Sequence, residues 1–341
     1  MNLDVVYQMY LSLNEDEKNE FLNRLNNTEI QLNSNDDFIS IVLEHSNNPL
    51  PDRLSCPHCQ SHKVVKNGFD KGIQRFKCKD CKKSFTWSNN TILYGSKKPF
   101  NAWKTFCECV MNKFPLRKCA SICKINLHTA FNWRHKVLDA LQNMHNSVVL
   151  NGIVESDETY FNLSLKGLRN LNRLPHERGS SNHVRGLSKE IVCVPCSVNL
   201  NGLSIGRITN LGKPSYNNLM NFYNNRIVEG SIFVTDSLNS YDPISHNMNL
   251  THVKIPTGRF TNGQFNIQRI NSYHSELKNL TNFHFRGVAT KYLNNYVVYH
   301  NFVNIAKETF SEKLEILKDF VFSTVCNTRG YKIVFRNSVP V

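Results

Sequence analysis

The spacing of apolar residues changes along the chain, and the changes divide it into segments. Between residues 99 and 141 the apolar positions recur at helical spacing, whereas from residue 153 onward short β-rich runs alternate with helical ones. This order predicts a multidomain α+β protein whose last large domain holds a mixed α/β sheet. The expected strands span residues 153–160, 191–198, 203–208, 232–236 and 252–255, and the expected helices lie near 215–224, 265–279 and 289–308.

The first 48 residues are predicted to form an acidic helical region. Residues 1–50 contain nine acidic residues against two basic ones, and Asn14 followed by Glu17 resembles a helix capping box. The segment 47–51 contains two prolines and breaks this periodicity, as a linker does. No secretion signal begins the chain, and no stretch approaches a membrane span of about 18 apolar residues. A cytoplasmic protein without a membrane partner is therefore expected.

Four cysteines have the spacing of a structural zinc site. Cys56 and Cys59 form one C-x2-C pair, and Cys78 and Cys81 form a second after eighteen residues. The residues between the pairs have the composition of a β-hairpin, which predicts a zinc ribbon over residues 52–90. The alternative is four unrelated buried thiols. Cys193 and Cys196 have the same spacing, but they are interpreted as buried strand residues because no second pair lies nearby.

Positive charge concentrates around this predicted ribbon. The formal net charge of the 341-residue chain is +14 at pH 7, and residues 53–118 alone hold fifteen basic residues against three acidic ones. Basic and aromatic residues alternate there, which is typical of nucleic-acid-binding modules. A polyanionic partner, double-stranded DNA, is favoured over a small-molecule substrate. The expected contacts from the ribbon are Lys66, Arg75, Lys82 and Lys83.

The helical segment 97–145 has the outline of a helix-turn-helix. A short helix from residue 116, a tight turn near Asn126 and a longer helix follow one another. An ordinary helical hairpin would give the same pattern, but the neighbouring basic ribbon favours DNA binding. The second helix is expected to expose residues that reach phosphates and base edges, namely His128, Thr129, Asn132, Arg134, His135 and Lys136.

Two predicted strands end in carboxylates. Asp157 lies at the end of the first strand of the α/β part, and Asp236 lies at the end of a later one. Asn271 follows Asp236 by thirty-five residues in a segment of helical character, and Lys278 is seven residues further on, so the two lie on nearly the same helix face. Two strand-end carboxylates could share one metal site; the alternative is that each caps the next turn.

These motifs together resemble zinc-ribbon insertion-sequence transposases with a DDE-type, ribonuclease H-like catalytic domain. The resemblance covers roughly residues 50–310. It is carried by the two C-x2-C pairs, the segment from Phe131 to Lys136, the segments 154–160 and 235–237, the segment from Asn271 to Lys278, and the stretch 285–296.

The resemblance implies that Asp157, Asp236 and Asn271 hold two Mg²⁺ or Mn²⁺ ions and that Lys278 contacts the DNA phosphate. Asparagine stands where the family more often has an acidic residue, and it supplies a neutral carbonyl oxygen to a hard cation. Glu155 shares the strand face of Asp157 and could assist, whereas Glu158 is expected on the opposite face. Glu276 is a poor substitute, five residues beyond Asn271. His274 could lie near the site or serve in packing or DNA contact.

The function expected from the resemblance is DNA cleavage and strand transfer at the ends of an insertion sequence, by a nucleoid-associated homo-oligomer on DNA. The catalytic domain is expected over residues 150–310, with a C-terminal extension over 311–341. Two alternatives stay open: a DNA-binding protein that has lost catalysis at Asn271, and a nuclease that cuts without joining. A basic segment between the first two strands is expected to touch DNA through Arg173, Arg178 and Arg185.

Overall fold

The computed structural model describes residues 55–70, 73–86, 88–89, 91–168, 171, 186, 188–259, 261–304, 309–324, 326 and 328–339. The expected acidic region over residues 1–48 lies outside these residues, as do Arg173, Arg178 and Arg185 of the basic segment.

The zinc-ribbon segment forms a three-stranded antiparallel sheet. Cys56, Cys78 and Phe85 are buried at its centre, and Phe76 packs against them. The core is small because most side chains of the first strand are exposed. A domain this small depends on a metal or on disulfides for stability. In the order β1-β2-β3, its strands are β1 (Val64–Asp70), β2 (Ile73–Cys78) and β3 (Ser84–Thr86).

Three helices follow the ribbon and include the predicted helix-turn-helix. Proline precedes two of them, where its fixed φ angle suits a helix start, and the Asn126 side chain caps the third by accepting from the Thr129 amide at 2.7 Å. Trp103 stacks on Trp133 with ring centroids 3.7 Å apart, which joins the first helix to the third. The helices are α3 (Phe100–Met111), α4 (Leu116–Ile122) and α5 (Leu127–Ser147).

The second half of the chain is built on a mixed sheet with the strand order β6-β5-β4-β8-β9. The first three strands in the chain pair antiparallel, and β8 and β9 run parallel to β4. This is the ribonuclease H-like arrangement that was expected. The strands are β4 (Ile153–Asn162), β5 (Ile191–Asn199), β6 (Ser204–Gly206), β7 (Asn210–Leu211), which pairs with β5, β8 (Ile232–Thr235) and β9 (Thr251–Lys254).

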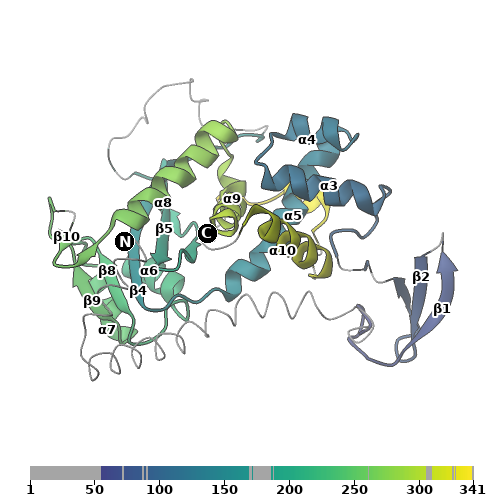
Figure 1. Ribbon diagram of the computed structural model, residues 1–341, viewed down its shortest axis with the longest axis horizontal. Helices are drawn as coiled ribbons and strands as arrows, with labels where there is room; N and C mark the ends of the chain where they lie inside the picture. The colour runs from purple at the N-terminus through teal and green to yellow at the C-terminus, as the bar shows by residue number, and fades with distance from the viewer. Residues whose placement is uncertain are drawn as a thin grey trace, which may run out of the picture. The chain divides into compact units, whose positions relative to one another are not determined.

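Helices cover both faces of this sheet (Figure 1). On one face, Ile270, Tyr273 and Leu277 of α8 and Val297 of α9 bury against the valines of β5. On the other face, Phe233 of β8 meets aromatic rings of α6 and α7. The helices are α6 (Tyr216–Tyr223), α7 (Tyr241–Asn247), α8 (Gln268–Asn279), which continues as the π-helical turn η2 (Leu280–His284), and α9 (Thr290–Val303).

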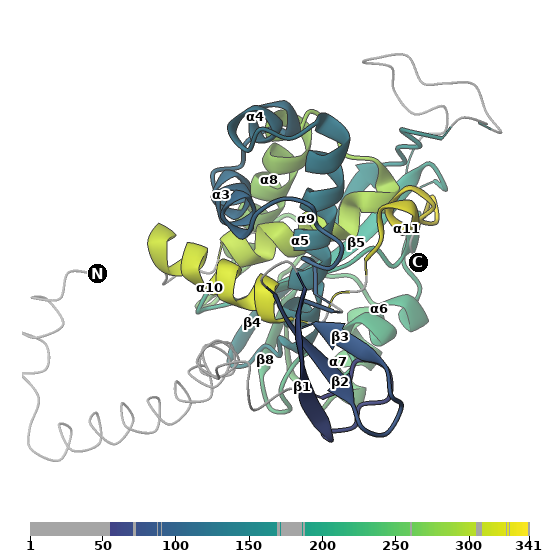
Figure 2. The ribbon, with the colours of Figure 1, turned by 90° about the vertical axis from the view of Figure 1, so that its right-hand side faces the viewer.

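The C-terminal residues pack against the helices that follow the ribbon (Figure 2). These residues form α10 (Phe310–Ser323) and α11 (Gly330–Val334). The Phe100 and Phe322 rings lie 4.7 Å apart, and Arg336 pairs with Asp139 of α5 at 2.6 Å. Residues 311–341 were expected to be an extension, but the described part of this segment completes the core around α5.

The strand and helix predictions agree with the structure except at their ends. The helix expected from residue 265 begins at Gln268, whose amide donates to the Asn266 side chain at 3.0 Å. Phe265 and Asn266 instead form β11, which pairs with β10 (Thr261–Asn262). Among the described residues, no helix is long and apolar enough to cross a membrane.

Candidate active site and zinc cluster

Two carboxylates lie at the same level of two neighbouring parallel strands. Asp236 directly follows β8 as expected, but Asp157, which was expected at the end of its strand, lies inside β4, which continues to Asn162. The β4–β8 register pairs Ile153 with Ile232 and ends with Ser156 opposite Thr235. Asp157 and Asp236 are the next residues on the two strands. Because adjacent strands lie about 4.8 Å apart, this register brings the two backbones side by side. The structure thus places together two residues that stand 79 positions apart in the sequence.

Asp157 is in an environment that opposes its negative charge. Burial raises its pKa to about 6, the charge of Asp236 adds to this rise, and the positive charge of Lys278 opposes it. One of its oxygens, Oδ1, accepts from the Glu158 amide at 2.8 Å. A cation between the two carboxylates would offset both the burial of Asp157 and the repulsion between the two charges. This pair is therefore a candidate cation site.

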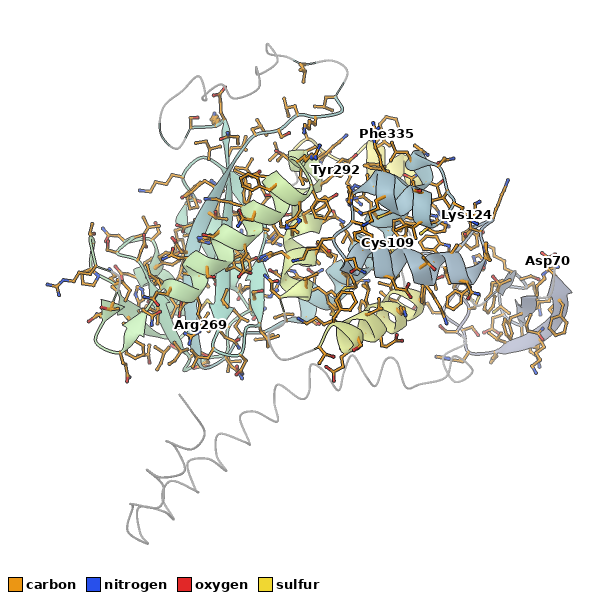
Figure 3. The ribbon with its side chains drawn as sticks, turned by 45° about the horizontal axis from the view of Figure 1, so that its top comes forward. Asp70, Cys109, Lys124, Arg269, Tyr292 and Phe335 are labelled. Atoms are coloured by element: carbon orange, nitrogen blue, oxygen red, sulfur yellow. The ribbon has the colours of Figure 1, made fainter. Side chains whose placement is uncertain are left out.

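Glu155 fixes the start of α8 beside these carboxylates. Its Oε2 accepts from the backbone amides of Arg269 at 2.8 Å and Ile270 at 3.1 Å, and its Oε1 accepts from Arg269 Nη1 at 2.9 Å. Figure 3 marks Arg269 at this end of the helix. A carboxylate at a helix N-terminus satisfies free amides and opposes the positive end of the helix dipole. Glu155 shares the strand face of Asp157, but α8 already occupies both of its oxygens.

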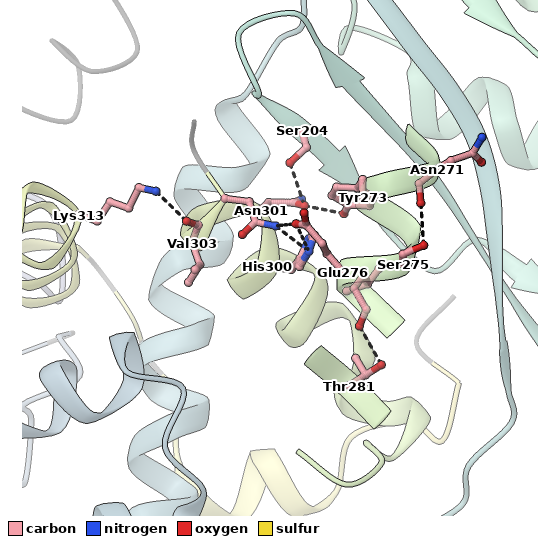
Figure 4. A network of polar contacts seen from close by, with 12 residues as sticks. Ser204, Asn271, Tyr273, Ser275, Glu276, Thr281, His300, Asn301, Val303 and Lys313 are labelled. Atoms are coloured by element: carbon pink, nitrogen blue, oxygen red, sulfur yellow. Dashed lines mark hydrogen bonds and ion pairs between the residues drawn. The ribbon is translucent and has the colours of Figure 1, made fainter. Parts of the chain in front are cut away.

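One face of α8 carries Asn271, His274 and Lys278. His274 Nδ1 lies 3.8 Å from Asp157 Oδ2, and burial lowers the pKa of His274 to about 4, with Lys278 adding to this effect. Asn271 and Lys278 are exposed, one turn on either side of His274. Figure 4 shows the Asn271 carboxamide directed away from the Tyr273–Asn301 contact. The structure therefore brings His274 to Asp157 and places Asn271 and Lys278 on the adjoining turns of that helix face.

The other glutamates of this region belong to different contacts. Glu276 lies away from the carboxylates, where its Oε2 accepts from Asn304 Nδ2 at 2.6 Å, so it does not replace Asn271. Glu158 points to the opposite face of the sheet, as expected, and accepts from the Tyr241 hydroxyl at 2.8 Å. Burial raises the pKa of Glu158 to about 7. Sequence reasoning missed the Glu155–α8 and Glu158–Tyr241 contacts, because each joins residues more than eighty positions apart.

The four cysteines of the ribbon come together as one cluster. One sulfur from each of Cys56, Cys59, Cys78 and Cys81 lies within 4.8 Å of all the others. The Cys56–Cys81 and Cys59–Cys78 sulfurs are 3.5 Å and 3.6 Å apart, close to the roughly 3.8 Å edge of a tetrahedral zinc–thiolate site. The Cys81 amide lowers the pKa of Cys78 to about 6, which favours the thiolate that zinc needs. The cluster fits a structural zinc ion.

The predicted DNA-binding side chains of the ribbon are accessible. Lys66 of β1 and Lys82 and Lys83 of the second knuckle are exposed, and Arg75 of β2 is half-buried. Phe69 is 71% exposed on the same sheet. This combination of lysines and an aromatic ring is compatible with a nucleic-acid surface.

The expectation that the longer helix exposes a row of DNA-reading side chains is wrong for Arg134, His135 and Lys136, whereas His128 at the start of the helix is exposed as expected. Arg134 is only 3% exposed, and its guanidinium donates to the Phe114 carbonyl and to Cys119 Sγ. His135 is 1% exposed. Lys136 is half-buried and donates to the Ile92 carbonyl at 3.0 Å. These residues face the protein interior because other helices, which the local sequence did not reveal, pack around α5.

Asn132 also differs from its expected position. It is half-buried against α11, where a Cβ atom added to Gly330 would lie 3.1 Å from Asn132 Nδ2. Exposed basic residues of this region include Arg117, Lys118 and Lys124 on and after the short helix α4. A strict helical period through residues 116–124 could have indicated this face, because Cys119, Ala120 and Cys123 form its buried side.

Two family models match the segments that carry these two sites. Residues 149–302 match the model of the ISXO2-like transposase domain, and residues 53–82 match the InsA N-terminal domain, a zinc-ribbon model. An uncharacterized protein in transposable element ISH50 of Halobacterium salinarum is 24% identical over 246 residues, which are 71% of this chain and 82% of the relative. The crystal structure of a pre-cleavage Mos1 transpososome covers 69% of this chain and 82% of its own, with 10% identity and a TM-score of 0.28.

The family matches span both segments that carry the predicted motifs. The ISXO2-like match contains Asp157, Asp236 and the α8 residues Asn271 and Lys278, and the InsA match contains all four cysteines of the cluster. Together they confirm the resemblance to zinc-ribbon insertion-sequence transposases: one segment is similar to the ISXO2-like transposase domain and the other to the InsA zinc ribbon.

Proposed function

We propose that this protein is a DNA transposase that binds the ends of an insertion sequence, cleaves them and joins them to a target strand. The observation that supports this most is the side-by-side placement of Asp157, inside β4, and Asp236, directly after the parallel strand β8, opposite the α8 face that bears Lys278. The basic zinc ribbon supports a DNA substrate, because its exposed lysines match a phosphate backbone.

The residues present fit divalent cations. Asp157 and Asp236 offer charged oxygens that repel each other without a cation, and Asn271 offers a neutral carbonyl oxygen. Mg²⁺ prefers such oxygen ligands, and Mn²⁺ accepts them as well. When bound, a pair of these ions would activate the attacking oxygen and stabilise the leaving one in phosphodiester cleavage. We assign Asp157, Asp236 and Asn271 as the ligands.

The remaining side chains of the face position the reactants. Lys278 is exposed one turn beyond His274, and we assign it to the non-bridging oxygens of the phosphate. Neutral His274 packs between the helix and Asp157 and can orient the carboxylate without competing for it as a cation. Glu155 holds the first turn of α8, and with it Asn271, against β4.

This proposal is tested with the purified full-length protein and a labelled DNA duplex that carries one element end, in the presence of Mg²⁺ or Mn²⁺. We expect nicking at the end and joining to a second duplex. Asp157→Ala should abolish both steps while DNA binding is kept, and Glu276→Gln on the far side of α8 is the matched control. An Asp157→Ala protein that still joins ends would refute the site assignment.

Two other functions predict different outcomes of the same experiment. If Asn271 marks a lost active site, the protein binds DNA but neither nicks nor joins it. If the protein is a nuclease, it nicks the end without joining. Calorimetric titration with Mn²⁺ distinguishes a protein that has lost its active site from a transposase, without relying on activity. An Asn271→Asp variant should bind Mn²⁺ more tightly than the wild type, because it adds a charge to the site.

We further propose that the protein acts as a homo-oligomer on DNA. Joining two ends of one element to one target requires two active sites to be held together. Light scattering of the protein with and without an end duplex tests this: a monomer-to-multimer change that depends on DNA supports it, and a monomeric complex contradicts it.

A further inference from the structure

We propose that Phe283 is a stacking platform for an unpaired DNA base beside the cleavage site. This inference rests on the proposed function, because it assumes that DNA lies along the α8 face that bears Lys278. Phe283 follows Lys278 by five residues and is 75% exposed, although phenylalanine is normally buried. The structure gives a reason for this exposure in the local geometry of the chain.

The turn that carries Phe283 is a single π-helical turn. The Phe285 amide donates to the Leu280 carbonyl at 3.1 Å, a bond across five residues, and Thr281 Oγ1 donates to the Leu277 carbonyl at 3.0 Å. Figure 4 shows Thr281 and the carbonyl that it contacts. Leu280 and Thr281 are buried, so the wider turn keeps the helix anchored while it directs Phe283 outward. π-helical turns of this kind occur frequently at functional sites.

The residues after Phe283 hold this turn in place. The Phe285 ring packs 4.9 Å from the Tyr296 ring and lies under the Arg134 guanidinium at 5.0 Å. The Gly287 amide donates to the Thr281 carbonyl at 2.8 Å. A segment anchored on both sides cannot fold Phe283 back into the core. The ring is therefore presented to solvent by a fixed backbone.

The residues around Phe283 are better suited to bind a nucleic-acid strand than to bind another protein. Asn282 and His284 on either side are exposed and polar, so the ring has no apolar neighbour directly beside it in the chain. Residues 277–304 contain no aspartate or glutamate. Exposed Arg286 has a positive φ of 52°, and its carbonyl accepts from Lys166 Nζ at 3.2 Å, which brings a second positive charge to the turn.

An isolated aromatic ring among cations is the arrangement with which proteins bind single-stranded nucleic acid. Bases inside a duplex are already stacked on one another, so the ring can only meet a base that has left the duplex. A DNA end opened for cleavage offers such a base within reach of Lys278. We therefore assign Phe283 to an unpaired base close to the scissile phosphate.

Fluorescence anisotropy with two DNA probes of the same length tests this inference. One probe is a blunt duplex, and the other is a duplex with a five-nucleotide single-stranded overhang. For the overhang probe, Phe283→Ala should weaken binding roughly 5- to 150-fold, the range given by the loss of one base–aromatic stack, and Phe283→Trp should restore it. Binding of the blunt duplex should change by less than twofold in both variants.

Phe335→Ala is the matched control, because Phe335 is 82% exposed at the C-terminal end of the described chain. If Phe283→Ala and wild type bind the overhang probe equally, or if Phe335→Ala weakens it as much as Phe283→Ala, the stacking assignment is wrong. If the wild type binds neither probe, the proposed DNA-binding function itself fails. A change in oligomeric state with unchanged DNA affinity would assign Phe283 to a second copy of the chain and overturn the inference.

Discussion

Replacement of Glu155 by glutamine tests how the active-site helix is held. Glu155 is 2% exposed, and its carboxylate accepts three hydrogen bonds, two from the first amides of α8 and one from the Arg269 side chain. Glutamine has the same shape. Its amide can still accept from the backbone with one oxygen, but its NH₂ group then faces the Arg269 guanidinium, which is also a donor.

The expected loss follows from the charge that is removed. A hydrogen bond to a charged group contributes about 1.5–3 kcal/mol, roughly twice a neutral one, and a carboxylate at a helix N-terminus adds up to about 1 kcal/mol. The Arg269 side chain is half exposed and can turn to solvent, so losing its hydrogen bond to residue 155 costs little stability. We expect Glu155→Gln to lower the free energy of unfolding by about 2–3 kcal/mol, or the Tm by roughly 5–10 °C.

Thermal and urea unfolding in the absence of divalent ions measure this effect. Glu276→Gln is the control, because Glu276 lies on the same helix with its side chain 56% exposed, and its replacement should change stability by less than about 0.5 kcal/mol. If Glu155→Gln is as stable as the control variant, the amides of α8 do not depend on the Glu155 charge, and the anchoring argument is refuted.

Three further predictions concern groups in different parts of the molecule. Asp157→Asn should stabilise the metal-free protein by about 2 kcal/mol, because burial opposes the Asp157 charge, and Mn²⁺ should raise the Tm of the wild type but not of this variant. Burial lowers the pKa of His145 to about 3, so protonation of this one residue in the unfolded state, near pH 6.5, should cost the wild type about 1.4 kcal/mol of stability at pH 5.5; His145→Leu should lose less than the wild type between pH 7.5 and 5.5, and equal losses would contradict this. Cys78→Ser should remove the one zinc expected in the ribbon, as measured by mass spectrometry of the native protein, and expose residues 55–86 to protease while the transposase domain resists; full zinc content in the variant would contradict the assignment.

The sequence predicted the parts of the fold that local pattern determines. The five main strands were correct because each combines an apolar run with turn residues at its ends. Asp236 could be placed because it directly follows such a run, whereas the strand that carries Asp157 continues to Asn162. The two C-x2-C pairs predicted one cluster, since the spacing of the ligands is itself the signal.

What the sequence did not predict depends on long-range contacts. Arg134 has the composition of a DNA-contacting residue, but its environment is set by Cys119, Phe114 and Phe285 from other segments. Glu155 was interpreted as a possible helper of Asp157, and only the structure shows that α8 uses its oxygens. In each case the local pattern gives the chemistry of a side chain, and the tertiary fold determines which groups that side chain contacts.

The packing of the C-terminal helices has a consequence for synthesis of the chain. Asp139 of α5 accepts from Asn295 Nδ2 at 2.6 Å, from Thr328 Oγ1 at 2.5 Å and from Arg336 Nη2 at 2.6 Å. These partners emerge from the ribosome long after α5 itself. The domain around α5 therefore cannot reach its final packing before Arg336 has left the ribosome, and a chain that stops before Arg336 would leave the half-buried Asp139 carboxylate without its cation. Translation through Arg336 is thus a precondition for the final packing around α5.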